Sequence, residues 1–298
     1  MIVQKILRSL ADRYYNIGFV GNSLDGIING EKLNVTYVKH SYKDHWFADP
    51  FILKVSDNQI DVLVEDFCLS LDRGRISLLR VDRQSYELKE LIPILTLPTH
   101  LSYPAILRRD GEVYIYPESG ASGKLKLYQL DVDSLELREH RVIAEGDIAD
   151  GTMTALFGDE IMFATEEPHK DGKILGIYRP NINGLFVKSD EIQFGEVIAR
   201  SAGDLFEYHG IVIRPAQESN EVYGHAVVLQ QITKQDNGLQ IKELRRLYSP
   251  SKEYPLGLHT FNIYQDVIVV DSIAYYHPFF AKLIRNCYKT IKKLKAWS

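Results

Sequence analysis

Acidic, basic and aromatic residues of the types used in carbohydrate chemistry recur at matching places along the chain. Each lies where a short apolar run starts or where the following run ends. The starts carry Asp49, Tyr103, Asp150, Arg200 and His259, and the ends carry Asp66, Glu118, Arg214, Gln217 and Asp271. Carboxylates that share a cleft push their pKa values apart, which suits acid–base catalysis. Rings and guanidinium groups beside them suit a polyhydroxylated ligand or a phosphate.

These residues belong to a hairpin pattern that occurs five times. A β-branched and aromatic run, a polar turn and a second run begin at Asp49, Tyr103, Thr152, Gly203 and Thr260, roughly fifty residues apart. Two further strand candidates follow each of the first four hairpins. Four strands per unit at this period form the blade of a β-propeller. The sequence therefore predicts an all-β, five-bladed β-propeller over residues 15–277.

The fifth hairpin lacks outer strands, because only the basic C-terminal segment follows it. The N-terminal region has spare strand candidates near Ile17–Val20 and Leu33–His40. We expect these strands to complete the fifth blade and close the ring, since closure leaves no open sheet edge between the first and last blades.

The predicted topology brings the ten candidate residues together. In a blade the first strand lines the channel, and its start lies beside the end of its antiparallel neighbour. All ten residues are therefore expected at one channel mouth, whereas the opposite hairpin turns are generic. The alternative is structural, because polar residues at a propeller rim also cap strands and tie blades together.

Both ends of the chain are predicted to be helical. Residues 1–14 form an amphipathic pattern, and residues 278–298 carry six basic residues, no acidic residue and an apolar stripe at helical spacing. A basic amphipathic helix either lies on an anionic membrane surface or packs on the acidic body of the protein. Both alternatives stay open from the sequence.

Composition narrows the remaining possibilities. The formal net charge of −5 argues against a nucleic-acid partner, and two cysteines are too few for a disulfide framework. The start has no signal-peptide core, so we expect a cytoplasmic protein or one peripheral to the inner membrane face. The sequence has no glycine-rich phosphate loop, no HExxH and no zinc-ligand spacing. We therefore expect no cofactor and no metal.

Eight motifs resemble the propeller module at the N-terminus of glucosamine inositolphosphorylceramide transferases and its stand-alone bacterial relatives. They are WFADPFI (46–52), HLSYPAIL (100–107), YPESG (116–120), DGT (150–152), ARSAGDLF (199–206), IRPAQE (213–218), YGHAV (223–227) and GLHTFN (257–262). They occur in order over about residues 15–275. In the plant proteins a separate glycosyltransferase domain follows this module. The resemblance therefore implies a carbohydrate-related propeller and does not carry over the transferase activity.

The chain more distantly resembles the five-bladed glycosidases, including glycoside hydrolase family 43. This resemblance implies that Asp49 is a general base and that Asp150 tunes a pKa. Where those hydrolases carry the general acid, this sequence has Ser201–Ala202–Gly203–Asp204, and alanine cannot donate a proton. Glu118 or Asp204 is left as the candidate acid. Substrate binding is assigned to Asp66, Tyr103, Arg200, Arg214, Gln217, His259 and Asp271.

Three functions fit these observations. The first is a sugar-active enzyme in the intracellular assembly of surface glycans or glycolipids, and the second is a family 43-like glycoside hydrolase. The third is a non-catalytic glycan-binding module that positions a separate glycosyltransferase. The expected ligand in all three is a sugar or glycoconjugate. A glycosyltransferase and an anionic membrane surface, contacted through residues 279–298, are the candidate macromolecular partners.

Overall fold

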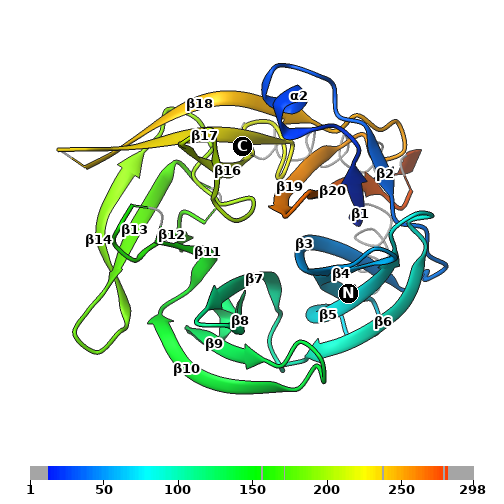
Figure 1. Cartoon of the computed structure of the whole chain (residues 1–298), viewed down its shortest axis with the longest axis horizontal. Coiled ribbons are helices and arrows are strands. Elements are labelled where there is room, and N and C mark those ends of the chain that lie inside the picture. The colour runs from blue at the N-terminus through cyan, green and yellow to red at the C-terminus, as the bar shows by residue number, and fades with distance from the viewer. Residues whose placement is uncertain (1–12, 156, 171, 237, 278, 281–298) are drawn as a thin grey trace, which may run out of the picture.

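The computed structural model describes residues 13–155, 157–170, 172–236, 238–277 and 279–280. Their strands form five four-stranded antiparallel sheets arranged around a common axis (Figure 1). The predicted five-bladed β-propeller is therefore confirmed.

The first four blades follow one another in chain order, from the innermost strand to the outermost. Blade 1 contains β3 (His45–Val55), β4 (Gln59–Cys68), β5 (Arg73–Asp82) and β6 (Leu88–Leu95). Blade 2 contains β7 (Ser102–Arg109), β8 (Glu112–Glu118), β9 (Lys124–Leu130) and β10 (Leu137–Glu145). Blade 3 contains β11 (Ile148–Thr154), β12 (Ile161–Glu166), β13 (Ile174–Pro180) and β14 (Phe186–Gln193). Blade 4 contains β15 (Phe206–Tyr208), β16 (Ile211–Glu218), β17 (Ala226–Gln235) and β18 (Gly238–Tyr248).

The fifth blade joins the two ends of the propeller. Its strand order is β19 (Gly257–Tyr264), β20 (Val267–Tyr275), β1 (Arg13–Val20) and β2 (Val35–Tyr37). β1 pairs with β20 over its whole length, from Arg13 opposite Tyr275 to Val20 opposite Ile268. The predicted closure by N-terminal strands is confirmed, because residues before His40 supply both outer strands.

The predicted terminal helices fall largely outside the described residues. β1 already begins at Arg13, so the last two residues of the predicted helix 1–14 are in a strand. Residues 1–12, 278 and 281–298 lie outside the described part of the chain. Two short helices were not predicted, α2 (Leu24–Ile28) and the 3-10 helix η1 (Gly120–Ser122). No helix within the described ranges is long and apolar enough to cross a membrane.

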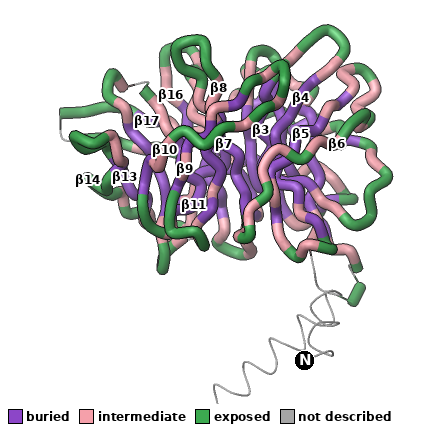
Figure 2. Tube along the Cα trace, turned by 90° about the horizontal axis from the view of Figure 1, so that it is seen from below, coloured by how far each residue is buried: buried purple, intermediate pink, exposed green. Residues whose placement is uncertain are grey.

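Apolar clusters between the blades form the core. One cluster joins blades 1, 2 and 3, and others join blades 3 and 4, 4 and 5, and 5 and 1. At the first of these joints, the rings of Phe51 and Tyr103 meet edge to face with centroids 4.9 Å apart. Figure 2 shows the buried residues concentrated between two exposed rims of loops. Burial of this apolar surface holds the blades in place and so fixes the positions of the side chains at the rim.

Candidate functional site

The inner strands share a local irregularity at one rim. The register shifts between Ala48 and Phe51 in β3, Ser102 and Pro104 in β7, Ala149 and Thr152 in β11, and Leu258 and Thr260 in β19. The residues within these β-bulges include Asp49, Tyr103, Asp150 and His259. In blade 4, Arg200 precedes the Ser201–Ala216 bridge and takes the corresponding place. The five residues predicted at strand starts therefore form a ring around one mouth.

Three of these residues have a strained backbone. Asp49, Tyr103 and Asp150 have φ values of 49°, 45° and 47°, in the left-handed region that favours glycine. Such a conformation costs a residue with a Cβ roughly 1–2 kcal/mol. β-Bulges redirect side chains and are frequent beside active sites. The same strained bulge in three blades points to a functional constraint on this mouth.

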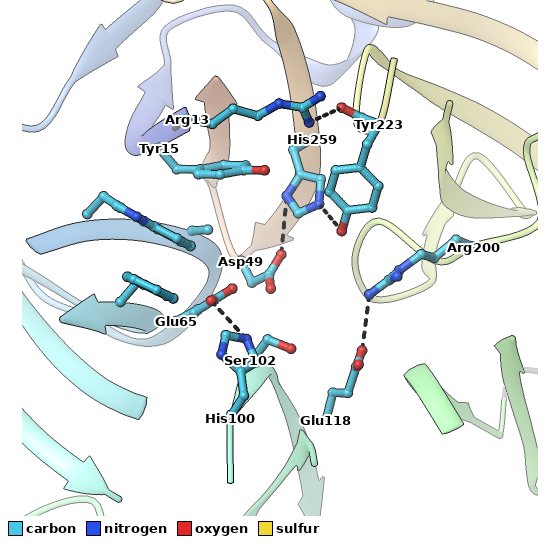
Figure 3. Close-up of a pocket in the computed structure, with 13 residues that line it drawn as sticks. Arg13, Tyr15, Asp49, Glu65, His100, Ser102, Glu118, Arg200, Tyr223 and His259 are labelled. Atoms are coloured by element: carbon cyan, nitrogen blue, oxygen red, sulfur yellow. Dashed lines mark hydrogen bonds and ion pairs between the residues drawn. The ribbon is translucent and has the colours of Figure 1, made fainter. Parts of the chain in front are cut away.

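A pocket of about 500 Å³ opens at this mouth (Figure 3). Four of the predicted site residues line it: Asp49, Glu118, Arg200 and His259. The sequence-based prediction did not include the other lining residues, Arg13, Tyr15, Trp46, Ala48, Glu65, Phe67, His100, Ser102 and Tyr223. The pocket thus combines three carboxylates with several cationic and aromatic side chains.

The other six predicted residues do not line the pocket. They are buried beside or beneath it, and they are Asp66, Tyr103, Asp150, Arg214, Gln217 and Asp271. Arg214, for example, is 0% exposed and donates hydrogen bonds to Ala199, Ser201 and Gln230. Gln217 donates to Asp150 Oδ2 at 3.0 Å and to the Ser201 carbonyl at 3.0 Å. Their hydrogen bonds to protein groups support the lining residues, and their predicted roles toward a ligand stay predictions.

Asp66 faces away from the pocket because successive strand residues point to opposite sides of a sheet. It accepts hydrogen bonds from Arg75 Nε and Ser77 Oγ, each at 2.8 Å. Its neighbour Glu65 lines the pocket instead and lies 3.1 Å from His100 Nε2. Of these two neighbours, Glu65 therefore lines the pocket, and the assignment of Asp66 to substrate binding stays a prediction.

His259 is the centre of a buried charge cluster. Its Nδ1 lies 3.0 Å from Asp271 Oδ2 and 3.4 Å from Asp49 Oδ1. Burial alone would lower the pKa of His259, but the Asp271 and Asp49 carboxylates more than offset it and raise this pKa to about 9. Burial would raise the pKa of Asp271, yet the His259 imidazolium and several donors hold that pKa below its ordinary value. His259 is therefore an imidazolium paired with Asp271 at neutral pH.

The same three residues have the spacing of a metal site. Ligand atoms of Asp49, His259 and Asp271 lie within 4.8 Å of one another. A metal would need the neutral imidazole as a ligand. The two carboxylates raise the pKa of His259, so a metal would have to displace the proton from this imidazole.

Tyr223 extends this cluster into the pocket. The protonated His259 donates from Nε2 to the Tyr223 hydroxyl oxygen, 3.0 Å away. The hydroxyl proton of Tyr223 is thereby left for another acceptor. Arg13 Nη1 donates to the Tyr223 carbonyl at 3.2 Å, and the Arg200 guanidinium carbon lies 5.5 Å from the ring centroid. Tyr223 belongs to the YGHAV motif, but the position of this motif after β16 did not indicate that the Tyr223 side chain lines the pocket.

A second cluster links Glu118, Arg200 and Asp150. Glu118 Oε2 accepts hydrogen bonds from Arg200 Nη2 and from the Asp150 backbone amide, each at 3.1 Å. Arg200 Nε also donates to Asp150 Oδ2 at 2.5 Å. Burial raises the pKa of Glu118 to about 8, while Arg200 lowers it and the Asp150 carboxylate raises it. The raised pKa favours the protonated form of Glu118.

Asp49 also has a raised pKa. Burial is the largest cause, the His259 imidazolium opposes it, and the Glu65, Asp150 and Asp271 carboxylates add to it. Asp49 Oδ2 accepts the Tyr103 amide hydrogen bond at 3.0 Å, and Oδ1 has no hydrogen-bond partner in the described residues. Asp49 is thus a strong base when ionised. Figure 3 shows Asp49 and Glu118 both directed into the pocket.

Four rings form a continuous aromatic wall along one side of the pocket, which we define as Tyr15, Trp46, Phe67 and His100. Tyr15 and Trp46 have centroids 4.8 Å apart, and Trp46 stacks on Phe67 at 4.7 Å with 2° between the planes. Phe67 and His100 follow at 6.2 Å. Because Trp46 stacks face to face with Phe67, the wall presents mainly ring edges, which form an apolar strip along the pocket.

Asp204, one of the two candidate acids, does not line the pocket. Burial raises its pKa to about 7, and Arg108 lowers it. Its backbone amide donates to Asn262 Oδ1 at 2.8 Å in the inner strand of the next blade. Glu118 is therefore the candidate acid that the pocket itself contains.

The charge clusters predict a fall in stability at alkaline pH. The folded-state pKa of His259 (about 9) lies above the ordinary histidine value of 6.5, so its contribution to stability is full below pH 6.5 and is lost as the pH rises through 9. Glu118, with a pKa raised from 4.5 to about 8, acts in the same direction. We expect the His259 contribution alone to lower the free energy of unfolding by about 2–3 kcal/mol between pH 6.5 and 9. Chemical denaturation at several pH values measures this change, and an equal fall in His259→Gln would contradict the assignment to His259.

The fold defines a class of protein, the five-bladed β-propellers. A glycoside hydrolase of family 43 from Xanthomonas citri has a TM-score of 0.52 and 12% identity, covering 78% of this chain and 88% of its own. An α-L-arabinofuranosidase from Clostridium thermocellum has a TM-score of 0.52 and 12% identity, and the match covers 73% of this chain and 78% of the arabinofuranosidase. Identities this low establish the fold alone.

Residues 34–246 match the family described as "Glucosamine inositolphosphorylceramide transferase 1, N-terminal", and the chain belongs to this family. The Oryza sativa subsp. indica protein of that name is 26% identical over 211 residues, which is 67% of this chain and 28% of the relative. The Arabidopsis thaliana protein of the same name is 27% identical over 147 residues, which is 45% of this chain and 18% of the relative. The resemblance inferred from the eight motifs is confirmed. The alignments span less than a third of either relative.

Proposed function

We propose that the pocket binds a sugar or glycoconjugate and carries out glycosyl-bond chemistry in the assembly of surface glycans or glycolipids. The observation that carries this proposal is the pair of carboxyl groups, Asp49 and Glu118, directed into one pocket beside the aromatic wall. Paired carboxyl groups in a cleft are the usual equipment for making or breaking glycosidic bonds.

The roles follow from the surroundings of each carboxyl group. Glu118, whose raised pKa favours the protonated form, donates its proton to the leaving oxygen. The bond between the anomeric carbon and this oxygen breaks, and the oxygen keeps the electron pair. Arg200 then stabilises the carboxylate that is left. Asp49 accepts the proton of the attacking hydroxyl group, which belongs to water in hydrolysis or to an acceptor sugar in transfer. Asp150 keeps the pKa of Glu118 high and holds Arg200 in place.

The family supports transfer over hydrolysis. The curated relatives are named as transferases, although this chain aligns with only 28% of the rice protein. Arg200 lines the pocket and supplies a fixed cation for a phosphate on the leaving side of an activated donor. Arg214, which was assigned to substrate binding from the sequence, is 0% exposed and does not line the pocket.

A second candidate function is a non-catalytic module that presents a glycan to a separate glycosyltransferase. Two observations favour it. Glu118 Oε2 is already engaged by Arg200 and the Asp150 amide, and the family 43 acid position is occupied by the fully buried Ala202. In this function the pocket and the aromatic wall bind the glycan, and the chemistry takes place on the partner.

Sugar binding is tested by Trp46→Ala. We expect this change to weaken binding to glycans selected on an array by roughly tenfold or more, since a central aromatic anchor typically contributes that much. Isothermal titration calorimetry measures the affinity. The matched control is Tyr248→Ala, which removes a ring that is 52% exposed at the end of β18 and does not line the pocket. Equal affinities for wild type and Trp46→Ala would contradict sugar binding at the aromatic wall.

A further inference from the structure

We propose that the pocket-bearing face rests on an anionic membrane surface, so that the pocket receives the head group of a lipid-linked glycoconjugate. The identity of the ligand rests on the proposed function, whereas the membrane contact rests on independent features of this face. These features are the positions of the first and last propeller strands, the exposed apolar side chains, and the positive charge of residues 281–298.

Both ends of the propeller leave it at the mouth. Arg13, the first residue of β1, lines the pocket and pairs with Tyr275, the last residue of β20. Residues that precede Arg13 and follow Tyr275 are therefore attached beside the pocket opening. The sequence 281–298 contains Lys282, Arg285, Lys289, Lys292, Lys293 and Lys295 and no acidic residue.

Exposed apolar side chains gather on the same face. Phe279 and Phe280, which follow β20, are 77% and 48% exposed. Tyr42 precedes β3 and Leu69 follows β4, and they are 41% and 43% exposed. β3 and β4 are joined by their turn at the opposite rim, so both residues lie at the mouth. Exposed aromatic and aliphatic residues beside a basic segment are typical of a surface that inserts into the membrane interface.

Charge fixes the orientation of the contact. The chain outside residues 281–298 has more acidic than basic residues, and an anionic membrane repels such a body. The basic segment attracts the same membrane, and in the sequence it continues from the end of β20, which lies at the mouth. The pocket therefore faces the lipid surface, where an anchored head group enters without leaving the bilayer. The other partner that fits the basic segment is the protein's own acidic surface.

The test uses the full chain and vesicles. We expect co-sedimentation at low salt with phosphatidylcholine vesicles containing 30 mol% phosphatidylglycerol, and roughly tenfold weaker binding in the double variant Phe279→Glu, Phe280→Glu. Leu69→Glu weakens binding in the same direction. The matched control is Ile182→Glu, since Ile182 is 101% exposed in the β13–β14 turn at the opposite rim. Absence of wild-type binding, or equal loss in Ile182→Glu, overturns the proposal in favour of a basic segment packed on the body.

Orientation is tested by fluorescence quenching. In a Trp297→Phe background, Trp46 at the mouth is the remaining tryptophan. Brominated lipids in the same vesicles should quench it, whereas Ile182→Trp in a background without Trp46 and Trp297 should stay unquenched. The reverse pattern overturns the orientation.

The membrane contact and the proposed function can fail separately. Phe279→Glu, Phe280→Glu should keep its affinity for a soluble glycan, and Asp49→Asn should keep vesicle binding. Loss of vesicle binding in wild type with glycan binding intact removes only the membrane contact. Vesicle binding without any glycan binding removes only the proposed function.

Discussion

Asp49→Asn is expected to lower turnover of the glycoconjugate that the protein processes by roughly 10²–10⁴-fold, the usual contribution of a positioned general base. Asparagine keeps an oxygen that accepts the Tyr103 amide hydrogen bond, so the bulge in β3 is retained. What it removes is the site that accepts the proton of the attacking hydroxyl group. Ligand affinity should change little, and product formation followed by mass spectrometry measures the loss.

Glu118→Gln provides the companion measurement. Glutamine resembles the protonated form that the raised pKa of Glu118 favours at neutral pH. It should therefore preserve folding and ligand binding while abolishing proton donation to the departing oxygen. Because an activated donor with a phosphate leaving group needs less acid assistance, a large loss in Asp49→Asn with a small loss in Glu118→Gln would indicate transfer from such a donor.

The matched control for both variants is Asp61→Asn. Asp61 is a buried aspartate on β4 in the same blade as Asp49, but it does not line the pocket. It should keep wild-type turnover. If Asp49→Asn and Glu118→Gln both leave turnover unchanged, the assigned catalytic roles are wrong. If no glycoconjugate is turned over and both variants weaken glycan binding, the module binds without catalysing.

The architecture was predictable because the propeller repeats one local pattern. A fifty-residue period and an incomplete fifth hairpin were sufficient to predict five blades and closure by N-terminal strands. Antiparallel pairing then placed strand starts and strand ends on one face, and Asp49, Glu118, Arg200 and His259 do meet there. Each of these inferences needs only periodicity and the geometry of neighbouring strands.

The lining of the pocket was harder to predict, because it depends on which way individual side chains point. A one-residue difference within β4 separates Glu65, which lines the pocket, from Asp66, which does not. The aromatic wall joins rings from β1, β3, β4 and the segment before β7, and no sequence spacing connects these four positions. Polar residues such as Arg214 and Gln217 have the composition of ligand-binding groups, but here their partners are buried protein groups.

Asp271→Ala is expected to lower the free energy of unfolding by about 3–5 kcal/mol, the typical cost of removing one partner of a buried ion pair. Asp271 is 0% exposed and accepts hydrogen bonds from the backbone amides of Asp49 and Thr260 at 2.9 and 2.7 Å. Its removal leaves the His259 imidazolium and these amides without their acceptor. Urea denaturation at pH 6.5 measures the loss.

Asp271→Asn separates the charge from the hydrogen bonds, because its carbonyl oxygen still accepts one amide while its charge is gone. The free energy of unfolding of Asp271→Asn should lie between those of wild type and Asp271→Ala. The pKa of His259, measured by NMR titration, should drop towards its ordinary value. A loss below about 1 kcal/mol in Asp271→Ala would show that the cluster does not stabilise the fold. The expected result links function to closure of the ring. Asp271 lies on β20, which pairs with β1 and so closes the ring. The hydrogen bond that Asp271 accepts from the Asp49 amide therefore ties the bulge in β3 to the strand that closes the propeller.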